Sequence, residues 1–323
     1  MPDKNKLISF TDAILDATLS VMHKDPNTIL FGLGVNDDRG LQGTTKDLFK
    51  HFGESRVFDI PIAEDAMMGF AVGAGISGLR PIFNHARMDF LLLTFNQLFN
   101  VGTKYSYMFD GNVKVPMIIR CLVGYGWGPQ HSQVLTSILS SFPGISVICP
   151  STPYDAKGLL LEASTKDYPV IFVEDFQLYS LKGHVPDGDY NIEFDAIRCM
   201  SRGDDITILT LSSATLEVER FLELNMQLSV DVHCLLSITD IDYDILEASV
   251  SRTGKLLFVQ NAWMEFGLGA NIARHLLLKG LKFEYGEVGF PFTPTPYAPN
   301  LESEYYVSSS RILTKVMDLV NKT

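Results

Sequence analysis

The chain has 323 residues, of which 46% are apolar and 20% charged, a balance typical of folded globular proteins. Its formal net charge of −12 argues against a nucleic-acid partner and against an anionic membrane surface. Four widely spaced cysteines without a CxxC pair argue against a zinc site or a disulfide scaffold, and with neither a signal peptide nor an apolar run of roughly 18 residues we expect a cytoplasmic protein.

The first half of the chain alternates between predicted strands and predicted helices. Apolar residues at helical spacing predict helices over residues 11–24, 90–107, 132–141 and 153–165, with a short glycine-spaced helix after Glu64. Short apolar runs predict strands at residues 28–31, 56–59, 80–83, 115–120, 145–148 and 170–173. Strands that alternate with helices imply a mostly parallel, doubly wound sheet covered on both faces.

A polar connector over residues 180–200 interrupts this pattern, and a second α/β run follows it. The second run has predicted strands at residues 205–210, 230–235 and 255–259, and predicted helices at 215–224 and after 267. We therefore predict an α/β protein with a domain at 1–183, a linker at 184–200 and a smaller α/β domain at 201–323.

Three residues that follow predicted strands are candidates for a site. Glu64 opens an apolar helix, where it is either a solvated acid favoured by the helix dipole or an acid held for chemistry. Phe90 is either a core aromatic or a ligand contact, and His131 is either a surface or capping histidine or an active-site group. Because ligands of parallel sheets bind at the carboxyl ends of strands, the three are expected to meet at one edge.

Several stretches occur in an order and spacing that resemble one enzyme family. They lie at residues 59–64, 73–81, 96–108, 130–133, 143–150, 155–159, 266–270 and 296–298. Together they resemble, over nearly the whole chain, the β subunit of the E1 component of thiamine-diphosphate-dependent 2-oxoacid dehydrogenases. The resemblance implies a thiamine pyrimidine-binding domain followed by a transketolase-like C-terminal domain.

The resemblance also implies roles for the candidate residues. Glu64 would bond to N1′ of the cofactor's aminopyrimidine and so favour the imino form that takes the thiazolium C2 proton. Phe90 would stack on the pyrimidine, Leu33 would contact the cofactor, and His131 would lie near the substrate.

One motif of the wider family is absent, because residues 1–323 contain no Gly-Asp-Gly sequence to hold the Mg²⁺-diphosphate. The resemblance therefore implies an α-like partner that carries Mg²⁺, an α2β2 assembly and an active site shared between chains. The leading expectation is decarboxylation of a 2-oxoacid with acyl transfer to a lipoyl acyltransferase. Two alternatives stay open: a split transketolase-like carboligase that passes its unit to an aldehyde or sugar, and a non-catalytic partner of an α-like chain.

The sequence departs from the family pattern at several places around the expected pocket. Residues 32–35 lack the usual acid pair, and the loop at 124–129 is shorter. His85 and Arg87 stand where the family has other residues; they are predicted either to add positive charge for an anionic or phosphorylated substrate, or to form a solvated rim. Lys166 falls at the position of an acidic ligand for a monovalent cation in some members, and its ammonium would replace or abolish that ion.

Overall fold

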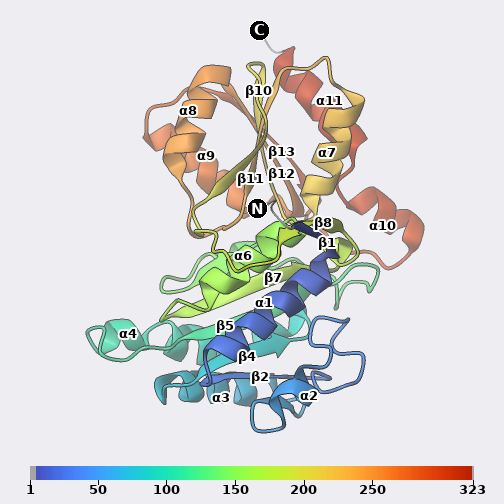
Figure 1. The fold of residues 1–323 in the computed structure, drawn as a ribbon. Coiled ribbons are helices and arrows are strands. Elements are labelled where there is room, and N and C mark those ends of the chain that lie inside the picture. The colour runs from blue at the N-terminus through green and yellow to red at the C-terminus, as the bar shows by residue number, and fades with distance from the viewer. Residues whose placement is uncertain (1–4, 322–323) are drawn as a thin grey trace.

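The computed structural model describes residues 5–321. They form two α/β lobes, each built around its own large sheet (Figure 1). The lower lobe in Figure 1, coloured blue to green, holds a six-stranded sheet, and the upper lobe, coloured yellow to red, holds a five-stranded sheet. Within the described residues, no helix is long and apolar enough to cross a membrane. The expected α/β class with two sheet domains is confirmed.

The six-stranded sheet is parallel throughout, as the alternation of strands and helices predicted. Its strands are, in spatial order, β3 (Val57–Asp59), β2 (Thr28–Gly32), β4 (Arg80–His85), β5 (Met117–Val123), β7 (Pro169–Asp175) and β6 (Ser146–Ile148). The chain leaves β2 toward one edge to form β3 and then returns past β2 to form β4. The order of strands therefore reverses direction at β2.

Each face of this sheet is covered by a different set of helices. One set is α1 (Phe10–Lys24) and α6 (Pro153–Ala163), which pack on each other, and the other is α3 (Glu64–Ile76) with the helical segments after β4. Successive residues of a strand point to opposite faces, so Ile82 joins the core under α1 while Phe83 joins the core under α3. Burial on both faces explains why the centre of β4 is apolar at consecutive residues.

The long helix predicted for residues 90–107 is wrong. The segment forms a 3₁₀ helix at Met88–Thr94, a π-helix at Asn96–Gly102 and a short α4 at Tyr105–Met108. Met88, Leu91 and Thr94 are all buried, and their spacing of three residues fits the tight 3₁₀ turn and not the 3.6-residue α turn.

The helix predicted for residues 132–141 is also mostly wrong, because only α5 (Thr136–Leu139) is helical. The residues before it are held in a loop by side-chain bonds. The Trp127 amide donates to the Ser132 hydroxyl at 3.1 Å, and the Gln133 amide donates to the Asp89 carboxylate at 3.1 Å. These bonds compete with the backbone bonds that a helix would need.

The second sheet is parallel except at one edge. Its strands are, in spatial order, β13 (Glu284–Phe290), β12 (Lys255–Trp263), β10 (Ile206–Leu211), β11 (Val230–Leu235) and the antiparallel β9 (Ile197–Ser201). Helices α7 (Ala214–Leu224) and α11 (Ser309–Val320) cover one face, and α8 (Tyr243–Thr253) and α9 (Leu268–Leu278) cover the other (Figure 1). The remaining helical turns are α2 (Leu48–Phe52), a 3₁₀ turn at Phe176–Leu178 and α10 (Pro299–Tyr305).

The connector between the lobes is more ordered than its polar composition predicts. β8 (Lys182–Pro186) crosses the predicted boundary at residue 183 and pairs antiparallel with β1 (Asn5–Ser9). β9 begins at Ile197, inside the predicted linker, and joins the second sheet. The domain boundaries predicted at residues 183 and 200 stay a proposal. β8 ends the part of the chain that belongs to the first domain, and β9 begins the part that belongs to the second.

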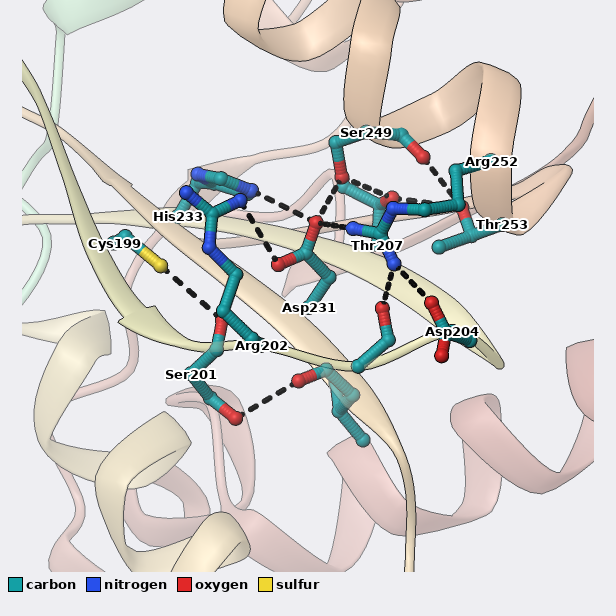
Figure 2. A network of polar contacts seen from close by, with 12 residues as sticks. Cys199, Ser201, Arg202, Asp204, Thr207, Asp231, His233, Ser249, Arg252 and Thr253 are labelled. Carbon is teal, nitrogen blue, oxygen red and sulfur yellow. Dashed lines mark hydrogen bonds and ion pairs between the residues drawn. The ribbon is translucent and has the colours of Figure 1, made fainter.

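A buried carboxylate joins β11 to α8 in the second domain (Figure 2). Asp231 on β11 accepts a hydrogen bond of 2.6 Å from the Ser249 hydroxyl, lies 3.1 Å from Nε2 of His233 and pairs with Arg252 of α8. Burial alone would raise the pKa of Asp231, but the bonds from Ser249 and His233 and the charge of Arg252 lower it below its ordinary value. The ionised form is thus the one that the fold stabilises.

We expect Asp231→Asn to lower the free energy of unfolding by about 2 kcal/mol, because it leaves buried donors and a guanidinium poorly paired. Asp204→Asn is the matched control, since Asp204 pairs with the same Arg252 but its side chain is 79% exposed. Asp204→Asn should lower the free energy of unfolding by less than about 1 kcal/mol, with both variants measured by urea titration. Equal losses would contradict the assignment of Asp231 as the centre of the network.

The lowered pKa of Asp231 gives a pH signature. A carboxyl whose pKa is lower in the folded state contributes stability that is fully present above its unfolded pKa of about 4 and is lost as pH falls through the lower folded value. Unfolding titrations between pH 6 and pH 3 should therefore show a smaller loss on acidification in Asp231→Asn than in the unaltered chain.

Candidate active site

A cavity lies where the strand order of the first sheet reverses. Loops that leave β2, β3 and β4 diverge there, which is the usual position of ligand sites in open parallel sheets. The cavity has a volume of about 420 Å³. Its walls come from the ends of these three strands and the first turn of α3, and consist of Leu33, residues 60–64, residues 83–87, Phe90 and Leu93.

Glu64 enters this cavity as the first residue of α3. No side chain caps that helix, so its first amides and the positive end of its dipole face the same space as the carboxylate. Glu64 is half-buried, and within residues 5–321 its carboxylate has no hydrogen bond or ion pair. An unpaired acid at the mouth of an apolar pocket favours the reading of an acid held for a ligand over that of a solvated cap.

Small residues let α3 bring Glu64 close to neighbouring backbone. A Cβ on Gly75 would stand 3.3 Å from the carbonyl oxygen of Pro116, and one on Gly69 would stand 3.6 Å from the Gln97 side chain. Larger side chains at these positions would push the helix away from the π-helix and β5. The glycine spacing seen in the sequence therefore fixes where α3 begins relative to the cavity.

Phe90 and His131 come together from separate loops. Their rings meet edge to face, with centroids 5.4 Å apart and planes at 85°. Phe90 lines the cavity, whereas His131 lies behind it and is not among the lining residues. The structure thus brings Leu33, Glu64 and Phe90 to one cavity. His131 does not line that cavity but contacts the ring of Phe90, which does.

The histidine loop is fastened to the 3₁₀ turn by a residue that the sequence analysis missed. Asp89 is 6% exposed, and its Oδ1 accepts from the Gln133 backbone at 3.1 Å and from the Gln133 amide side chain at 2.9 Å. Gln133 belongs to a stretch that the sequence singled out, but nothing in the sequence indicated Asp89 as its partner. This pairing sets the distance between His131 and Phe90.

Two polar side chains at the end of β4 are almost fully enclosed. Asn84 is 2% exposed and His85 is 3% exposed, and both line the cavity. Within the described chain, both polar atoms of the Asn84 amide and Nε2 of His85 have no hydrogen-bond partner. Buried polar atoms without partners are costly, so these three atoms mark the wall as one that a ligand completes.

The positive charge predicted at His85 is wrong. Burial lowers the pKa of His85 to about 4, so the ring is neutral at physiological pH. Its Nδ1 lies 2.9 Å from the carbonyl oxygen of Arg87, which can only accept, so Nδ1 carries the proton. Nε2 therefore carries an unpartnered lone pair.

Lys166 lies far from the cavity, at the end of α6. Its ammonium pairs with the Glu162 carboxylate and stands 4.9 Å from the centre of the Phe194 ring. Arg80 donates to the carbonyl oxygen of Lys166 at 3.0 Å. Two protein cations thus lie near this helix end, and the replacement of a monovalent ion by Lys166 stays a prediction. In residues 5–321, no group of three or more His, Cys, Asp or Glu has a geometry that could hold a metal ion.

Comparison with known sequences assigns both domains. The family described as the transketolase pyrimidine binding domain matches residues 6–182, and the transketolase C-terminal domain matches residues 195–312. The first match covers the cavity and every candidate residue.

Full-length relatives give the same result. The β subunit of acetoin:2,6-dichlorophenolindophenol oxidoreductase is 36% identical in Cupriavidus necator, over 94% of this chain and 95% of its own length. Its Bacillus subtilis counterpart is 34% identical over 98% of both chains. The β subunit of the pyruvate dehydrogenase E1 component of Porphyra purpurea is 36% identical over 97% of this chain and 96% of its own length.

A solved structure shares the fold. A split-gene transketolase, described as an inactive β4 tetramer, superposes with a TM-score of 0.80 over 97% of this chain and 98% of its own length. At 19% identity the match bears on the fold alone. The resemblance drawn from the sequence, and the two-domain architecture that it implied, are confirmed.

Asp89→Ala should loosen the loop that carries His131. Loss of a charged acceptor for two bonds raises local opening by about tenfold, since about 1.4 kcal/mol corresponds to a factor of ten. Hydrogen exchange should speed up in residues 124–135 and stay unchanged in β5. Asp89→Asn, which keeps an acceptor oxygen, is the control, and unchanged exchange in Asp89→Ala would contradict the fastening role.

His85 should stay neutral well below the range in which an ordinary histidine titrates, because its burial lowers its pKa to about 4. We expect the ring ¹⁵N signals of His85, assigned by loss in His85→Gln, to stay those of the Nδ1–H form from pH 8 to about pH 5. Titration near pH 6.5 would show that the side chain is hydrated.

Proposed function

This chain belongs to the family of E1 β subunits with transketolase-type pyrimidine-binding and C-terminal domains, and we propose that it forms one half of a thiamine-diphosphate site completed by an α-like chain. The observation that carries the proposal is the unpaired Glu64 carboxylate, which lines the same cavity as Phe90 at the reversal of the strand order. Mg²⁺ and the diphosphate are assigned to the α-like chain, since residues 1–323 hold no Gly-Asp-Gly sequence.

The residues present fit an aminopyrimidine ring. The cavity offers an aromatic face at Phe90, apolar contact at Leu33 and an unpaired carboxylate at Glu64. The unpartnered Asn84 amide adds donor and acceptor atoms at the same wall. A flat heteroaromatic group with polar edges matches this set of contacts.

When bound, thiamine diphosphate supplies the carbanion and the electron sink for cleavage beside a substrate carbonyl. Glu64 would hold a proton against a ring nitrogen in the closed, apolar surroundings that binding creates. Phe90 would fix the plane of the ring and exclude water from that face. His131, which lies behind Phe90, would reach the substrate side of the site from its loop.

We propose a 2-oxoacid as substrate, with the acyl unit passed to a lipoyl acyltransferase and an α2β2 assembly. Support comes from relatives named as E1 β subunits of pyruvate dehydrogenase and as subunits of acetoin oxidoreductase. The second candidate is a carboligase that passes the same unit to an aldehyde or sugar, and the observation in its favour is the altered wall at residues 84–87.

The first experiment is co-purification of the chain with mass-spectrometric identification of its partners. An α-like chain with Gly-Asp-Gly supports the shared site, and a lipoyl acyltransferase beside it supports the dehydrogenase. An α-like chain without a lipoyl protein favours the carboligase. Absence of any α-like chain would overturn the shared-site proposal.

Glu64→Gln should lower the turnover of the reconstituted complex by at least about 100-fold while leaving assembly intact, because the amide cannot exchange a proton with the ring. Asp65→Asn is the matched control, since Asp65 is the next acid of the same helical turn but is exposed. Turnover and native mass would be measured for both. Unchanged turnover in Glu64→Gln would contradict a catalytic role of Glu64 and would favour the alternative that this chain is a non-catalytic partner of the α-like chain.

A further inference from the structure

We propose that Arg87 binds the anionic group of the substrate, a carboxylate or a phosphate, in the cavity that Glu64 also lines. The inference rests on the proposed function and names a specificity-determining residue for it. Arg87 lines the cavity together with Glu64 and Phe90.

The guanidinium of Arg87 is held in a fixed orientation. Its central carbon lies 4.1 Å from the centre of the Trp127 ring, and its Nη1 donates to the carbonyl oxygen of Ala86 at 2.6 Å. Trp127 is itself held, because its amide donates to Ser132 and its ring packs 4.8 Å from that of Phe176. Stacking on an aromatic ring leaves the edge of a guanidinium free to bind oxygen atoms.

Arg87 lacks the partners that the other enclosed arginines have. Arg120 forms a two-bond pair with Glu174, Arg80 pairs with Asp25 and Asp167, and Arg311 donates to three carbonyl oxygens. In residues 5–321, Arg87 has no carboxylate within ion-pair distance, and its buried Nε has no acceptor.

Burial lowers the pKa of Arg87, and the charge of Asp89 offsets part of that effect without forming an ion pair. Asp89 binds Gln133 through Oδ1 and makes no ion pair with Arg87. Tyr179 hydrogen-bonds to Glu174 at 2.8 Å. A partly enclosed cation without a counter-ion raises the affinity for an anion that enters the cavity, because the desolvation of the cation is already part of the fold.

His85 complements Arg87, because it accepts a hydrogen bond where Arg87 donates. His85 lines the cavity, and its Nε2 carries an unpartnered lone pair. A lone pair repels a carboxylate or phosphate oxygen and accepts an O–H or N–H. An anion therefore goes to Arg87, and a hydroxyl or an amine goes to His85. Arg87 and His85 would therefore recognise two different groups of the substrate.

The loop of Trp127 links this anion site to the candidate histidine. Trp127 and His131 belong to one loop, and a Cβ at Gly124 would collide with the His131 backbone and the Trp127 ring, so the loop folds tightly on itself. An anion on Arg87 would thus lie between the end of β4 and the segment that carries His131.

The test compares Arg87→Gln with the unaltered chain in the complex reconstituted with its α-like partner. Three substrates are used: pyruvate, which carries a carboxylate; acetoin, which carries no charge; and glyceraldehyde 3-phosphate as an acceptor with a phosphate. We expect the KM for the anionic substrate to rise at least about tenfold with little change in kcat, and the KM for acetoin to stay unchanged. Arg87→Lys should recover part of the loss.

The pattern of changes identifies the anion. A higher KM for pyruvate alone assigns a carboxylate, and a higher KM for glyceraldehyde 3-phosphate alone assigns a phosphate. Arg220→Gln is the control, since Arg220 is 67% exposed on α7, remote from the cavity. Unchanged KM values for both anions, or an equal rise for acetoin, would overturn the role of Arg87.

A binding measurement keeps this inference separate from the proposed function. The chain has two tryptophans, so Trp263→Phe leaves Trp127, on which Arg87 stacks, as the single reporter. Titration of the full chain with pyruvate and with inorganic phosphate should change its fluorescence in a saturable way, and Arg87→Gln should abolish the change. Saturable binding without turnover of any substrate would support Arg87 and overturn the proposed function, whereas no response would overturn Arg87.

Discussion

The reversal of strand order at β2 is the constraint on which the rest of the structure depends. Because β3 and β4 lie on opposite sides of β2, the loops that follow these strands cannot cover the same edge, and a cavity stays open between them. The candidate residues that line the cavity follow these strands in the chain: Leu33 follows β2, Glu64 follows β3 and Phe90 follows β4. The chemistry that the site can perform is then set by which side chains follow each strand.

The enclosed polar groups of this cavity support the proposal that one chain alone makes an incomplete site. A folded protein rarely leaves buried donors and acceptors unpaired, because each costs about 1–3 kcal/mol. Here Asn84, His85 and Arg87 all have unpartnered atoms at the end of one strand. The fold tolerates this cost because burial of β4 between two helical layers stabilises its position. Strain of this kind at a strand end is expected where a ligand and a second chain supply the missing contacts.

How far the sequence predicts this structure depends on the range of the interactions concerned. Strands such as β4 and β7 follow from local apolar runs, and the parallel sheet follows from their alternation with helices. The 3₁₀ and π segments after β4 do not, because their turns are set by which of Met88, Leu91 and Phe99 reach the core. The neutral state of His85 was also out of reach, since it depends on burial by residues far apart in the chain. The pairing of Asp89 with Gln133 was missed for the same reason.

The two domains are coupled through the same edge that carries the site. The Cys149 amide donates to the Leu236 carbonyl at 2.8 Å, and the Ser213 hydroxyl donates to Asp175, at the end of β7, at 2.5 Å. Burial raises the pKa of Asp175 to about 6, so the charge at this junction is sensitive to neighbouring donors near neutral pH. β7 and β4 both flank β5, so these bonds join the second domain to the same carboxyl edge of the sheet at which the cavity lies.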